Sequence, residues 1–559
     1  MIKGLYSKSV CCVVFLIFSL SIYSQNTVGV LTFEENQTLD GYTLLYPQLQ
    51  GNVYLIDNCG EVIHEWIDSS FFWPGLSVYL LENGNLLKTK RPNTFIPGSF
   101  SSGGAGAIVE LVSWDNELIW SKEIANSTFR MHHDVEMLPN GNVLIIVWQR
   151  RPRSEFIDAG GDTTMFNFTE IWPDIIQEYD PVLDSVVWVW DVWNHLVQDF
   201  DNEKDNYGDV ASSRGKIDLN YDLGEFGGRP DWIHTNAIDY NEDLDQILLS
   251  ASHFEEIWII DHSTTTEEAK GNSGGKFGKG GQILFRWGNP RAYKMGDHED
   301  KQLFFQHDVH WIDDLSLADS EYYQAIGLFN NRIENDKSSI DILRPTLNTE
   351  LNDYVTESGT FLPSSFAKSI ESSDDLPFQS SNMSSMQFLP NGNFFVCGAQ
   401  SGRILEIATE NETAWDYILP FRNGFRVSQG SDLNIGDNVI FRAKRYDVNY
   451  GAFSGKDLEP KYYLELEPNI DFCDISLNTF ESPMTEFKLF PVPAHNILNI
   501  QNDEIIIKEV SIYNSIGMNL KQFEDVNSSN FTLDTSKYNS GIYFVILNNS
   551  FIYKVFIIN

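Results

Sequence analysis

Cysteine is scarce in this sequence, at 5 of 559 residues. Cys11 and Cys12 lie in an N-terminal apolar run, which leaves Cys59, Cys397 and Cys473 for the rest of the chain. An odd number permits at most one disulfide among these three. Because a chain of this length can bury a large core without covalent cross-links, we interpret all three as buried small hydrophobic residues, with one disulfide as the alternative.

Long apolar runs are almost absent as well. The run at residues 10–22 follows Lys3 and Lys8 and ends close to Ser24. This pattern is typical of a secretory signal, which we assign to residues 1–24. The run is too short for a typical membrane span, and no later segment has about 18 consecutive apolar residues. We therefore expect an exported chain without a membrane span.

Positive charge is in short supply. Lys and Arg number 38 against 79 Asp and Glu, which gives a formal net charge of −41. Such a field repels DNA, RNA and anionic membrane surfaces, so we expect no nucleic-acid partner. An anionic substrate would require a pocket in which the sign of the charge is locally reversed.

The sequence does contain an internal repeat built on hairpin turns. In three segments an Asn-Gly-Asn turn is followed by an apolar run, and Asn-Gly favours the tight turn of a β-hairpin. Two further segments fit the same pattern without the literal turn. The five segments are residues 76–85, 133–142, 234–243, 307–316 and 384–393.

A second half-repeat recurs between these segments and closes on tryptophan. It is a strand, a turn and a strand that ends at Trp66, Trp120, Trp190, Trp287 or Trp415. Two hairpins per repeat make four strands, and four-stranded units around an axis make a β-propeller. Five repeats are clear, and the N-terminal strands with residues 438–446 can supply a sixth. We predict an all-β chain in which residues 25–475 form a six-bladed β-propeller.

Histidine holds the same repeat position in three units, as His133, His234 and His307. The first strand of a blade lines the central channel, so these side chains should converge. Three histidines can hold zinc, but these lack a short His-x-His spacing, and we predict no metal or other cofactor. Neutral imidazole can instead act as nucleophile or acid–base group. Asp134 and Asp308 should point to the opposite face and bind turns or neighbouring backbone.

Arginine is the second candidate ingredient of a site. Arg150, Arg151, Arg332 and Arg403 follow their repeat anchors at similar intervals, so some of them can reach the same end of the channel. Solvated surface arginines are the alternative interpretation. Asn331, beside Arg332, can add hydrogen-bond donors. Guanidinium and imidazolium groups are suited to neutralise an anionic group during its transfer.

Three motifs in order resemble the bacterial arylsulfate sulfotransferases: MHHDVEMLPNGN, DWIHTNAIDYNEDLDQILLSASHFEEIWIID and FFQHDVHWI. The resemblance extends over about residues 41–450. It implies a six-bladed propeller that transfers a sulfuryl group from a phenolic sulfate ester to a phenol without the nucleotide sulfate donor. It also implies that His307 is transiently sulfated. His133 and His234 would hold the sulfuryl oxygens and handle protons.

One departure from the family pattern affects the expected site. The family has an arginine just after the second motif, in a Ser-Ser-Arg-His context, whereas this chain has Ser252 followed by His253. Either His253 or an arginine among Arg150, Arg151 and Arg332 must compensate, or the reaction differs. We therefore assign substrate binding to His253, Arg332, Asn331 and Arg151. An aryl sulfate hydrolase and a non-catalytic exported propeller that binds glycan or protein are the alternatives.

The pattern changes near residue 484. Residues 484–559 show alternating β sequence with glycine turns, and we predict a small separate β-sandwich. The pieces LFPVPAHNILNI, VSIYNSIG and SGIYFVIL, with Lys554 near the end, resemble the type A sorting domain of the type IX secretion system. The resemblance implies a Bacteroidetes-type source, the type IX machinery as partner, and export through the periplasm to the cell surface or medium.

Overall fold

The computed structural model describes residues 26–473, except 71, 95, 97, 165, 167, 335, 409–411 and 471, and residues 487–558, except 503–504, 515–517 and 549–550. The predicted signal at residues 1–24 lies outside the described residues. The chain divides into two compact units, Met1–Cys473 and Asp474–Asn559. No helix in the described ranges has the length and apolar character needed to cross a membrane.

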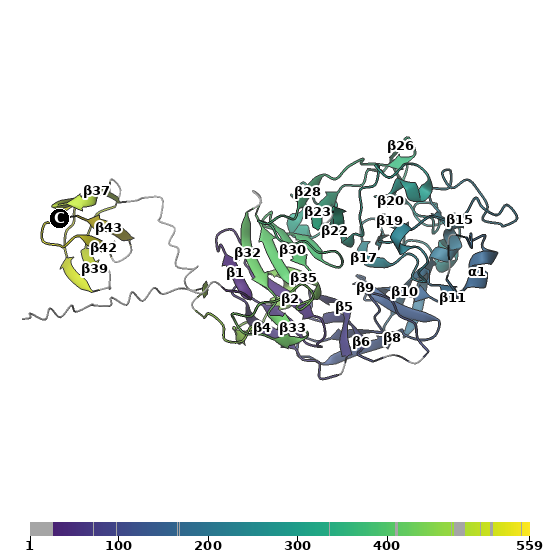
Figure 1. Cartoon of the computed structure of the whole chain (residues 1–559), viewed down its shortest axis with the longest axis horizontal. Coiled ribbons are helices and arrows are strands. Elements are labelled where there is room, and N and C mark those ends of the chain that lie inside the picture. Colours follow the sequence, from purple (N-terminus) through teal and green to yellow (C-terminus); the bar gives the residue numbers. More distant parts are fainter. Residues whose placement is uncertain are drawn as a thin grey trace, which may run out of the picture. The chain divides into compact units, whose positions relative to one another are not determined.

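The first unit is built from antiparallel sheets that follow one another along the chain (Figure 1). Three of them are regular four-stranded sheets in which each strand pairs with the next: β5 (Phe72–Leu80), β6 (Leu86–Pro92), β7 (Ile108–Val112) and β8 (Leu118–Glu123); β9 (Phe129–Met137), β10 (Val143–Gln149), β13 (Asp174–Asp180) and β14 (Ser185–Asp191); and β17 (Thr235–Asn241), β18 (Gln246–Ala251), β19 (Glu256–Asp261) and β20 (Phe285–Trp287).

Three more sheets follow, and two of them are completed by N-terminal strands. They are β21 (His307–Trp311), β22 (Ile326–Glu334), β23 (Lys337–Leu343) and β28 (Lys368–Glu371); β29 (Ser385–Phe388), β30 (Phe394–Gly398), β31 (Arg403–Ile407) and β32 (Thr413–Ile418) with β1 (Gly29–Phe33); and β35 (Ile440–Asp447) with β2 (Gly41–Pro47), β3 (Val53–Ile56), β4 (Glu61–Trp66) and β36 (Tyr462–Tyr463). Pairing of β1 with β32 and of β2 with β35 joins the two ends of the unit.

The connections carry short elements. Five strand pairs occur there: β11 (Arg151–Pro152) with β12 (Glu170–Ile171), β15 (Leu196–Val197) with β16 (Ile217–Asp218), β24 (Leu347–Asn348) with β25 (Asp353–Tyr354), β26 (Thr356–Glu357) with β27 (Thr360–Phe361), and β33 (Phe421–Arg422) with β34 (Phe425–Arg426). Two short α-helices, α1 (Arg153–Asp158) and α2 (Thr266–Ala269), also lie in the described connections.

The first strand of each sheet contacts the first strand of the next in a closed cycle: β5, β9, β17, β21, β29, β35 and back to β5. This is the arrangement of a β-propeller, with inner strands around a central axis. The predicted all-β class is confirmed. The three Asn-Gly turns have their glycines in the left-handed region, with φ of 84° at Gly84, 88° at Gly141 and 87° at Gly392, as a tight hairpin requires.

The repeated tryptophans lie in the fourth strands of the sheets, and four of the five donate an indole hydrogen bond to the neighbouring sheet. Trp66 donates its indole N–H to Ser113 O at 3.1 Å, and Trp190 donates to Gly281 O at 2.7 Å. Trp287 and Trp415 make the equivalent bonds to Pro363 O and Asn58 O. Each acceptor belongs to the next sheet in the cycle, so the tryptophan period in the sequence follows from one inter-sheet contact repeated around the axis.

The cysteines correct one sequence interpretation. Cys59 and Cys473 form a disulfide with Cα atoms 5.8 Å apart and a sequence separation of 414, so the interpretation of both as reduced core residues was wrong. Cys59 lies in the turn between β3 and β4, and Cys473 follows β36, which pairs with β4. The two meet only after the sheet has closed, which sequence spacing does not reveal. Cys397 is a free thiol in the core, as predicted.

His262 gives the fold an unusual pH dependence. Burial alone would lower the pKa of His262, but hydrogen bonds to Asp245 (2.7 Å) and Glu178 (3.2 Å) outweigh it and raise the pKa to about 9. A raised histidine pKa stabilises the fold fully below the unfolded value near 6.5, and this contribution is lost as the pH rises through about 9.

We expect His262→Gln to lower the free energy of unfolding by about 3 kcal/mol at pH 6 and by much less at pH 10, since one pKa unit corresponds to about 1.4 kcal/mol. Urea denaturation of wild type and variant across this range measures the difference. A difference that is independent of pH would show that the two carboxylates do not hold the protonated ring.

The second unit contains a seven-stranded sheet. Its strands run in the order β40 (Asn519–Phe523), β39 (Val510–Asn514), β42 (Gly541–Leu547), β43 (Phe551–Ile557), β37 (Lys488–His495), β38 (Ile497–Gln501) and β41 (Asn530–Asp534). Apolar residues at alternate strand positions form its core, among them Leu498, Ile500, Ile512 and Val545. This alternation is the pattern that the sequence showed.

Candidate active site

A cavity of about 540 Å³ opens at one end of the ring of inner strands, and we call it the histidine pocket. Its lining includes four histidines, three arginines and one phenylalanine: His133, His234, His253, His307, Arg91, Arg229, Arg332 and Phe305. The three histidines predicted from the repeat are therefore brought together, and His253 and Arg332 join them. The pocket combines imidazole and guanidinium groups in a protein of strongly negative net charge.

Local backbone irregularities direct the histidines into this pocket. His133 and His234 have φ values of 53° and 55°, and Asp308, which follows His307, has a φ of 54°. The strand register shifts at these positions in β9 and β21, and in β17 it shifts just after His234, between Thr235 and Ile238. Such bulges bend a strand and re-aim its side chains. Each of the three histidines predicted from the repeat thus lies at or beside a β-bulge.

His133 packs against a glycine loop. Its N–H donates to Gly104 O at 2.8 Å, and a Cβ added at Gly104 would lie 2.0 Å from Cε1 of the His133 ring. Gly104 also has a φ of +81°, so a larger residue is excluded by both contact and conformation. Behind it, His132 stacks on Trp148 and approaches His133 with Nδ1 atoms 2.9 Å apart. The ring of His133 is therefore held on both sides.

His234 forms a buried dyad with Asp231. Nδ1 of His234 lies 2.6 Å from Oδ2 of Asp231, and Asp231 is only 2% exposed. Burial alone would raise the pKa of Asp231, but the charge of His234 outweighs burial and holds that pKa below its usual range. The carboxylate keeps a proton on Nδ1 whether or not Nε2 is protonated, so Nε2 is the nitrogen left for chemistry.

His253 stacks on His234, with ring centroids 4.5 Å apart and planes within 7°. Its Nδ1 donates to Asp231 O at 3.1 Å, and burial lowers the pKa of His253 to about 3. Donor atoms of Asp231, His234 and His253 lie within 4.8 Å of one another, a spacing that a metal could use. Because the two rings are almost parallel, however, their in-plane lone pairs do not converge on one point. The arrangement fits a hydrogen-bonded dyad better than a metal centre.

His307 presents its other nitrogen to the pocket. Nδ1 lies 3.1 Å from Phe305 O and 2.8 Å from Asn331 Oδ1. The Asn331 amide is oriented by donation from Nδ2 to Ser380 O and Met383 O, so its oxygen faces the ring. Two acceptors require a proton on Nδ1 and leave the Nε2 lone pair free. Burial lowers the pKa of His307 to about 3, which keeps the ring neutral at ordinary pH.

The arginines require a correction. Arg151 does not line the histidine pocket; its guanidinium binds Glu155 at 2.8 Å and Asp191 at 2.9 Å. β10 ends at Gln149, and the chain then turns outward into β11 and α1, which carries Arg151 to the periphery. Arg332 does reach the pocket and stacks on Phe305, with Cζ 4.2 Å from the ring centroid.

The candidate Asn331 and also Ser252 lie behind the pocket wall. Asn331 holds His307 through the bond described above and does not itself line the cavity. Ser252, at the position of the family arginine, is fully buried and donates to His234 O at 2.7 Å. Its hydroxyl therefore supports the backbone of His234 and is not available to a substrate.

Sequence reasoning missed Asp231, Arg91 and Arg229. A signal for Asp231 was present, because aspartate three residues before a histidine can reach its ring in a turn. A weaker signal existed for Arg91: the dipeptide Arg-Pro occurs at the end of β6 as well as after β10, as Arg91-Pro92 and Arg151-Pro152. Only the three-dimensional course of the two connections separates them.

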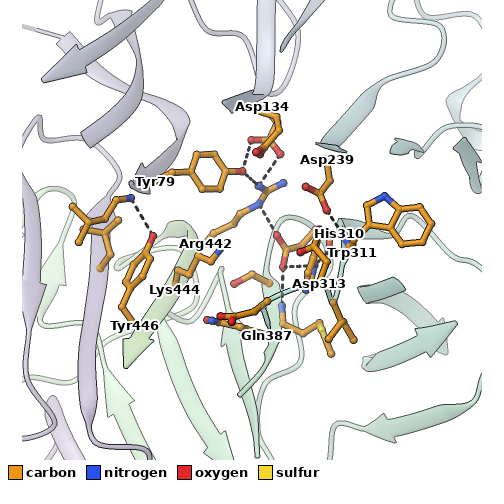
Figure 2. A pocket seen from close by; sticks show the side chains of 18 of the residues that line it. Tyr79, Asp134, Asp239, His310, Trp311, Asp313, Gln387, Arg442, Lys444 and Tyr446 are labelled. Atoms are coloured by element: carbon orange, nitrogen blue, oxygen red, sulfur yellow. Dashed lines mark hydrogen bonds and ion pairs between the residues drawn. The ribbon is translucent and has the colours of Figure 1, made fainter. Parts of the chain in front are cut away.

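A second cavity of about 350 Å³ lies among the same inner strands, and we call it the acidic cavity (Figure 2). Glu136, Asp239, Asp313, His310 and Lys444 contribute polar groups to its lining. Burial, and then the charge of Asp313, raises the pKa of Asp239 to about 7. Mutual repulsion of carboxylates adds to the effect of burial in this shift. No motif in the sequence pointed to this cavity.

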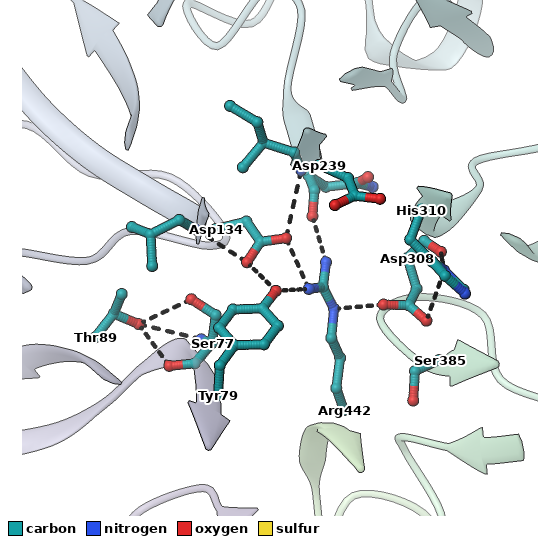
Figure 3. A network of polar contacts seen from close by, with 12 residues as sticks. Ser77, Tyr79, Thr89, Asp134, Asp239, Asp308, His310, Ser385 and Arg442 are labelled. Atoms are coloured by element: carbon teal, nitrogen blue, oxygen red, sulfur yellow. Dashed lines mark hydrogen bonds and ion pairs between the residues drawn. The ribbon is translucent and has the colours of Figure 1, made fainter. Parts of the chain in front are cut away.

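Arg442 of β35 lies at the centre of a buried ion cluster (Figure 3). Nη1 contacts Asp134 at 2.7 Å and Nε contacts Asp308 at 2.9 Å. Tyr79 donates its hydroxyl to Asp134 at 2.7 Å. Asp308 also accepts the N–H of Met386, so binding to neighbouring backbone occurs as predicted. The expectation that the two aspartates avoid the axis was wrong, because the strand bulges break simple alternation.

Two family models match parts of this chain. Residues 27–350, more than half of the chain, match the family model for arylsulfotransferase (ASST), and residues 488–559 match that for a secretion system C-terminal sorting domain. A search of curated proteins found no match. The sorting domain is that of type IX secretion and marks the chain for export, to the cell surface or as a secreted protein.

Solved structures show only distant likeness. A protein of unknown function from Bacteroides caccae is 11% identical, with 73% of this chain and 98% of that chain covered and a TM-score of 0.37. A catalytically inactive virginiamycin B lyase from Staphylococcus aureus is 9% identical, with 70% and 88% covered and a TM-score of 0.30. A streptogramin B lyase is 9% identical, with 72% and 85% covered and a TM-score of 0.31. The assignment does not depend on them: by the match over residues 27–350, the chain belongs to the arylsulfotransferase (ASST) family.

Proposed function

We propose that this protein transfers a sulfuryl group from a phenolic sulfate ester to a phenolic acceptor through a covalent sulfohistidine at His307, without a nucleotide sulfate donor. The observation that carries the proposal is the setting of His307: its Nδ1–H is held by Phe305 O and Asn331 Oδ1, and the residue lines the pocket. This leaves Nε2 as the nitrogen that would act as nucleophile. Family membership supports aryl sulfotransferase activity in general.

The same proposal covers the architecture. Residues 25–475 would form a six-bladed β-propeller, since six sheets have inner strands in a closed cycle. Residues 484–559 would form a β-sandwich that serves as the sorting domain. The type IX secretion machinery would be the protein partner, and an aryl sulfate donor and a phenol would be the small-molecule partners.

In the first step, Nε2 of His307 attacks the sulfur of the ester. The N–S bond forms, the bond between sulfur and the aryl oxygen breaks, and the aryl oxygen takes a proton from the protonated His234 to leave as a phenol. A phenol has a pKa near 10 and is a better leaving group than an alcohol. The sulfated ring keeps its proton on Nδ1, where Asn331 Oδ1 accepts it.

In the second step, an acceptor phenol gives its proton to His234 and attacks the same sulfur. The N–S bond breaks and neutral His307 is restored, so the proton and the imidazole both return to their starting points. We assign the acid–base role to His234 because, of the four pocket histidines, it is the one with a carboxylate partner, Asp231. A carboxylate stabilises the imidazolium form that the first step requires.

Intact mass spectrometry tests the covalent step. Wild-type protein mixed with 4-nitrophenyl sulfate in the absence of acceptor should release nitrophenol and gain the mass of one sulfuryl group, located on His307 by peptide mapping. Addition of phenol should remove the adduct and yield phenyl sulfate. Release of inorganic sulfate in place of phenyl sulfate would favour a hydrolase. No nitrophenol and no adduct would rule the proposal out.

A further inference from the structure

The histidine pocket contains a cation that nothing in the described protein neutralises. Arg91, near the end of β6, lines the pocket with His133, His234 and His307. Its Nε is buried without a hydrogen-bond partner, and within the described residues no carboxylate lies at ion-pair distance from its guanidinium. Burial lowers the pKa of Arg91, as expected for a charge without a counter-charge.

A second guanidinium strengthens the positive potential there. Burial, and then the charge of Arg91, lowers the pKa of Arg130, which lies three residues before His133. Arg130 is 6% exposed, and its donors go to neutral oxygens, Gly106 O at 2.9 Å and Phe100 O at 2.7 Å. Burying one guanidinium group almost completely and a second one partly, with no carboxylate beside them, is costly unless an anion binds there.

The other pocket arginines are less suited to this role. Arg332 is already held by Ser381 O at 2.8 Å and by Glu225 at 3.1 Å. Arg229 is exposed, so water screens its charge. Ser252 is used by the backbone of His234. Arg91 alone combines partial burial, free donors and a place in the pocket wall.

The backbone beside Arg91 leaves room for an anion. Residues 102–104, which are Ser-Gly-Gly, line the same cavity. At Gly103 an added Cβ would have one neighbour within 4 Å, Cε1 of His234 at 3.8 Å. A group bound between this loop and Arg91 would therefore lie near the catalytic imidazoles.

We infer that Arg91 is the anion-binding residue of the histidine pocket: its guanidinium binds the sulfuryl oxygens of the donor, in place of the arginine that the family carries at position 252. The planar fork of guanidinium matches two oxygens of a sulfate ester, as it matches those of a phosphate or carboxylate. The inference rests on the proposed sulfuryl transfer for the identity of the anion, but the anion site itself can be tested apart from turnover.

The test uses the full chain with Arg91→Met, Arg91→Lys and a matched control, Arg150→Met. Arg150 is an exposed arginine that pairs with Glu170 at 2.6 Å and does not line the pocket. Two quantities are measured: kcat/KM for 4-nitrophenyl sulfate with phenol as acceptor, and the affinity for inorganic sulfate by calorimetry at constant ionic strength set with chloride.

Both quantities should fall roughly 10- to 100-fold in Arg91→Met, the usual effect of losing a charged hydrogen bond. Arg91→Lys should recover part of the sulfate affinity, and Arg150→Met should stay within about twofold of wild type. Arg91→Met with unchanged thermal stability, unchanged kcat/KM and unchanged sulfate affinity would overturn the inference while leaving the proposed function intact. If the wild type turns over no aryl sulfate but loses sulfate binding on Arg91→Met, the anion site stands and the proposed function fails.

Discussion

His307→Ala is expected to lower turnover of 4-nitrophenyl sulfate by at least about a thousandfold and to abolish the sulfuryl adduct, because it removes the attacking atom itself. The neighbouring imidazoles do not substitute for it. Nδ1 of His234 is committed to Asp231, and Nδ1 of His253 to the carbonyl of Asp231. Neither ring is held by Phe305 and Asn331 in the orientation that aims Nε2 of His307.

The sequence offers a matched control three residues away. His310→Asn changes a histidine of the same strand, β21, that lines the acidic cavity and not the histidine pocket. It should keep kcat/KM within a few-fold of wild type. Nitrophenol release and intact mass are measured for both variants. A sulfuryl adduct that persists in His307→Ala would show that another residue is the nucleophile.

The pH dependence of the adduct follows from the same ring. Because burial lowers the pKa of His307 to about 3, the imidazole is neutral above that value and loses its lone pair only on protonation below it. The rate of adduct formation should therefore show no loss from His307 protonation between about pH 5 and 8. A profile with an acid limb near the ordinary histidine pKa of about 6.5 would contradict this account of the nucleophile.

Among the substitutions considered, Arg442→Met should lower stability most. The expected loss is about 3–5 kcal/mol in the free energy of unfolding, the usual cost of leaving buried charges unpaired. Arg442 belongs to β35 and holds Asp134 of β9 and Asp308 of β21. Through these carboxylates the cluster reaches Tyr79 of β5 and the N–H of Met386 of β29.

Two further hydrogen bonds link the remaining inner strand, β17, to the Arg442 cluster. Asp134 accepts the N–H of Ile238, and Arg442 donates to Asn236 O at 3.3 Å. One guanidinium thus links all six inner strands, and its loss leaves two carboxylates without a cation at the axis.

Urea denaturation followed by tryptophan fluorescence measures this effect, with Arg150→Met as the comparison. The exposed Arg150–Glu170 pair should contribute no more than about 1 kcal/mol. Adding Asp134→Asn and Asp308→Asn to Arg442→Met should restore part of the lost stability, because it removes the unpaired charges. Equal losses for Arg442→Met and Arg150→Met would show that the axial cluster is not a stabilising link.

Much of the site followed from periodicity. Histidine at one position of a repeat must recur at one place in each sheet, and the first strands of successive sheets face a common axis. For this reason the sequence alone suffices to assign His133, His234 and His307 to one pocket. Tryptophan periodicity marked the fourth strands for a similar reason, since four of the five indoles make the same hydrogen bond to the next sheet.

Other parts depended on contacts between distant segments. Arg91 at the end of β6 and Arg151 just after β10 both precede a proline, yet one enters the histidine pocket and the other pairs with Glu155 and Asp191. The Cys59–Cys473 bond joins residues that closure of a sheet brings together. Strand alternation misplaced Asp134, because a bulge rotates the backbone at that point.

The amino-acid sequence by itself determined the all-β class, the four-strand repeat, the sorting domain and the convergence of three histidines. Each of these follows from the residues of local turns or from a fixed period along the chain. Tertiary structure alone decided which nitrogen of each histidine is free, which arginine lacks a counter-charge and which aspartates meet Arg442 at the axis. These depend on hydrogen bonds and charges contributed by residues up to several hundred positions apart, and on bulges that re-aim individual side chains, neither of which a period can encode.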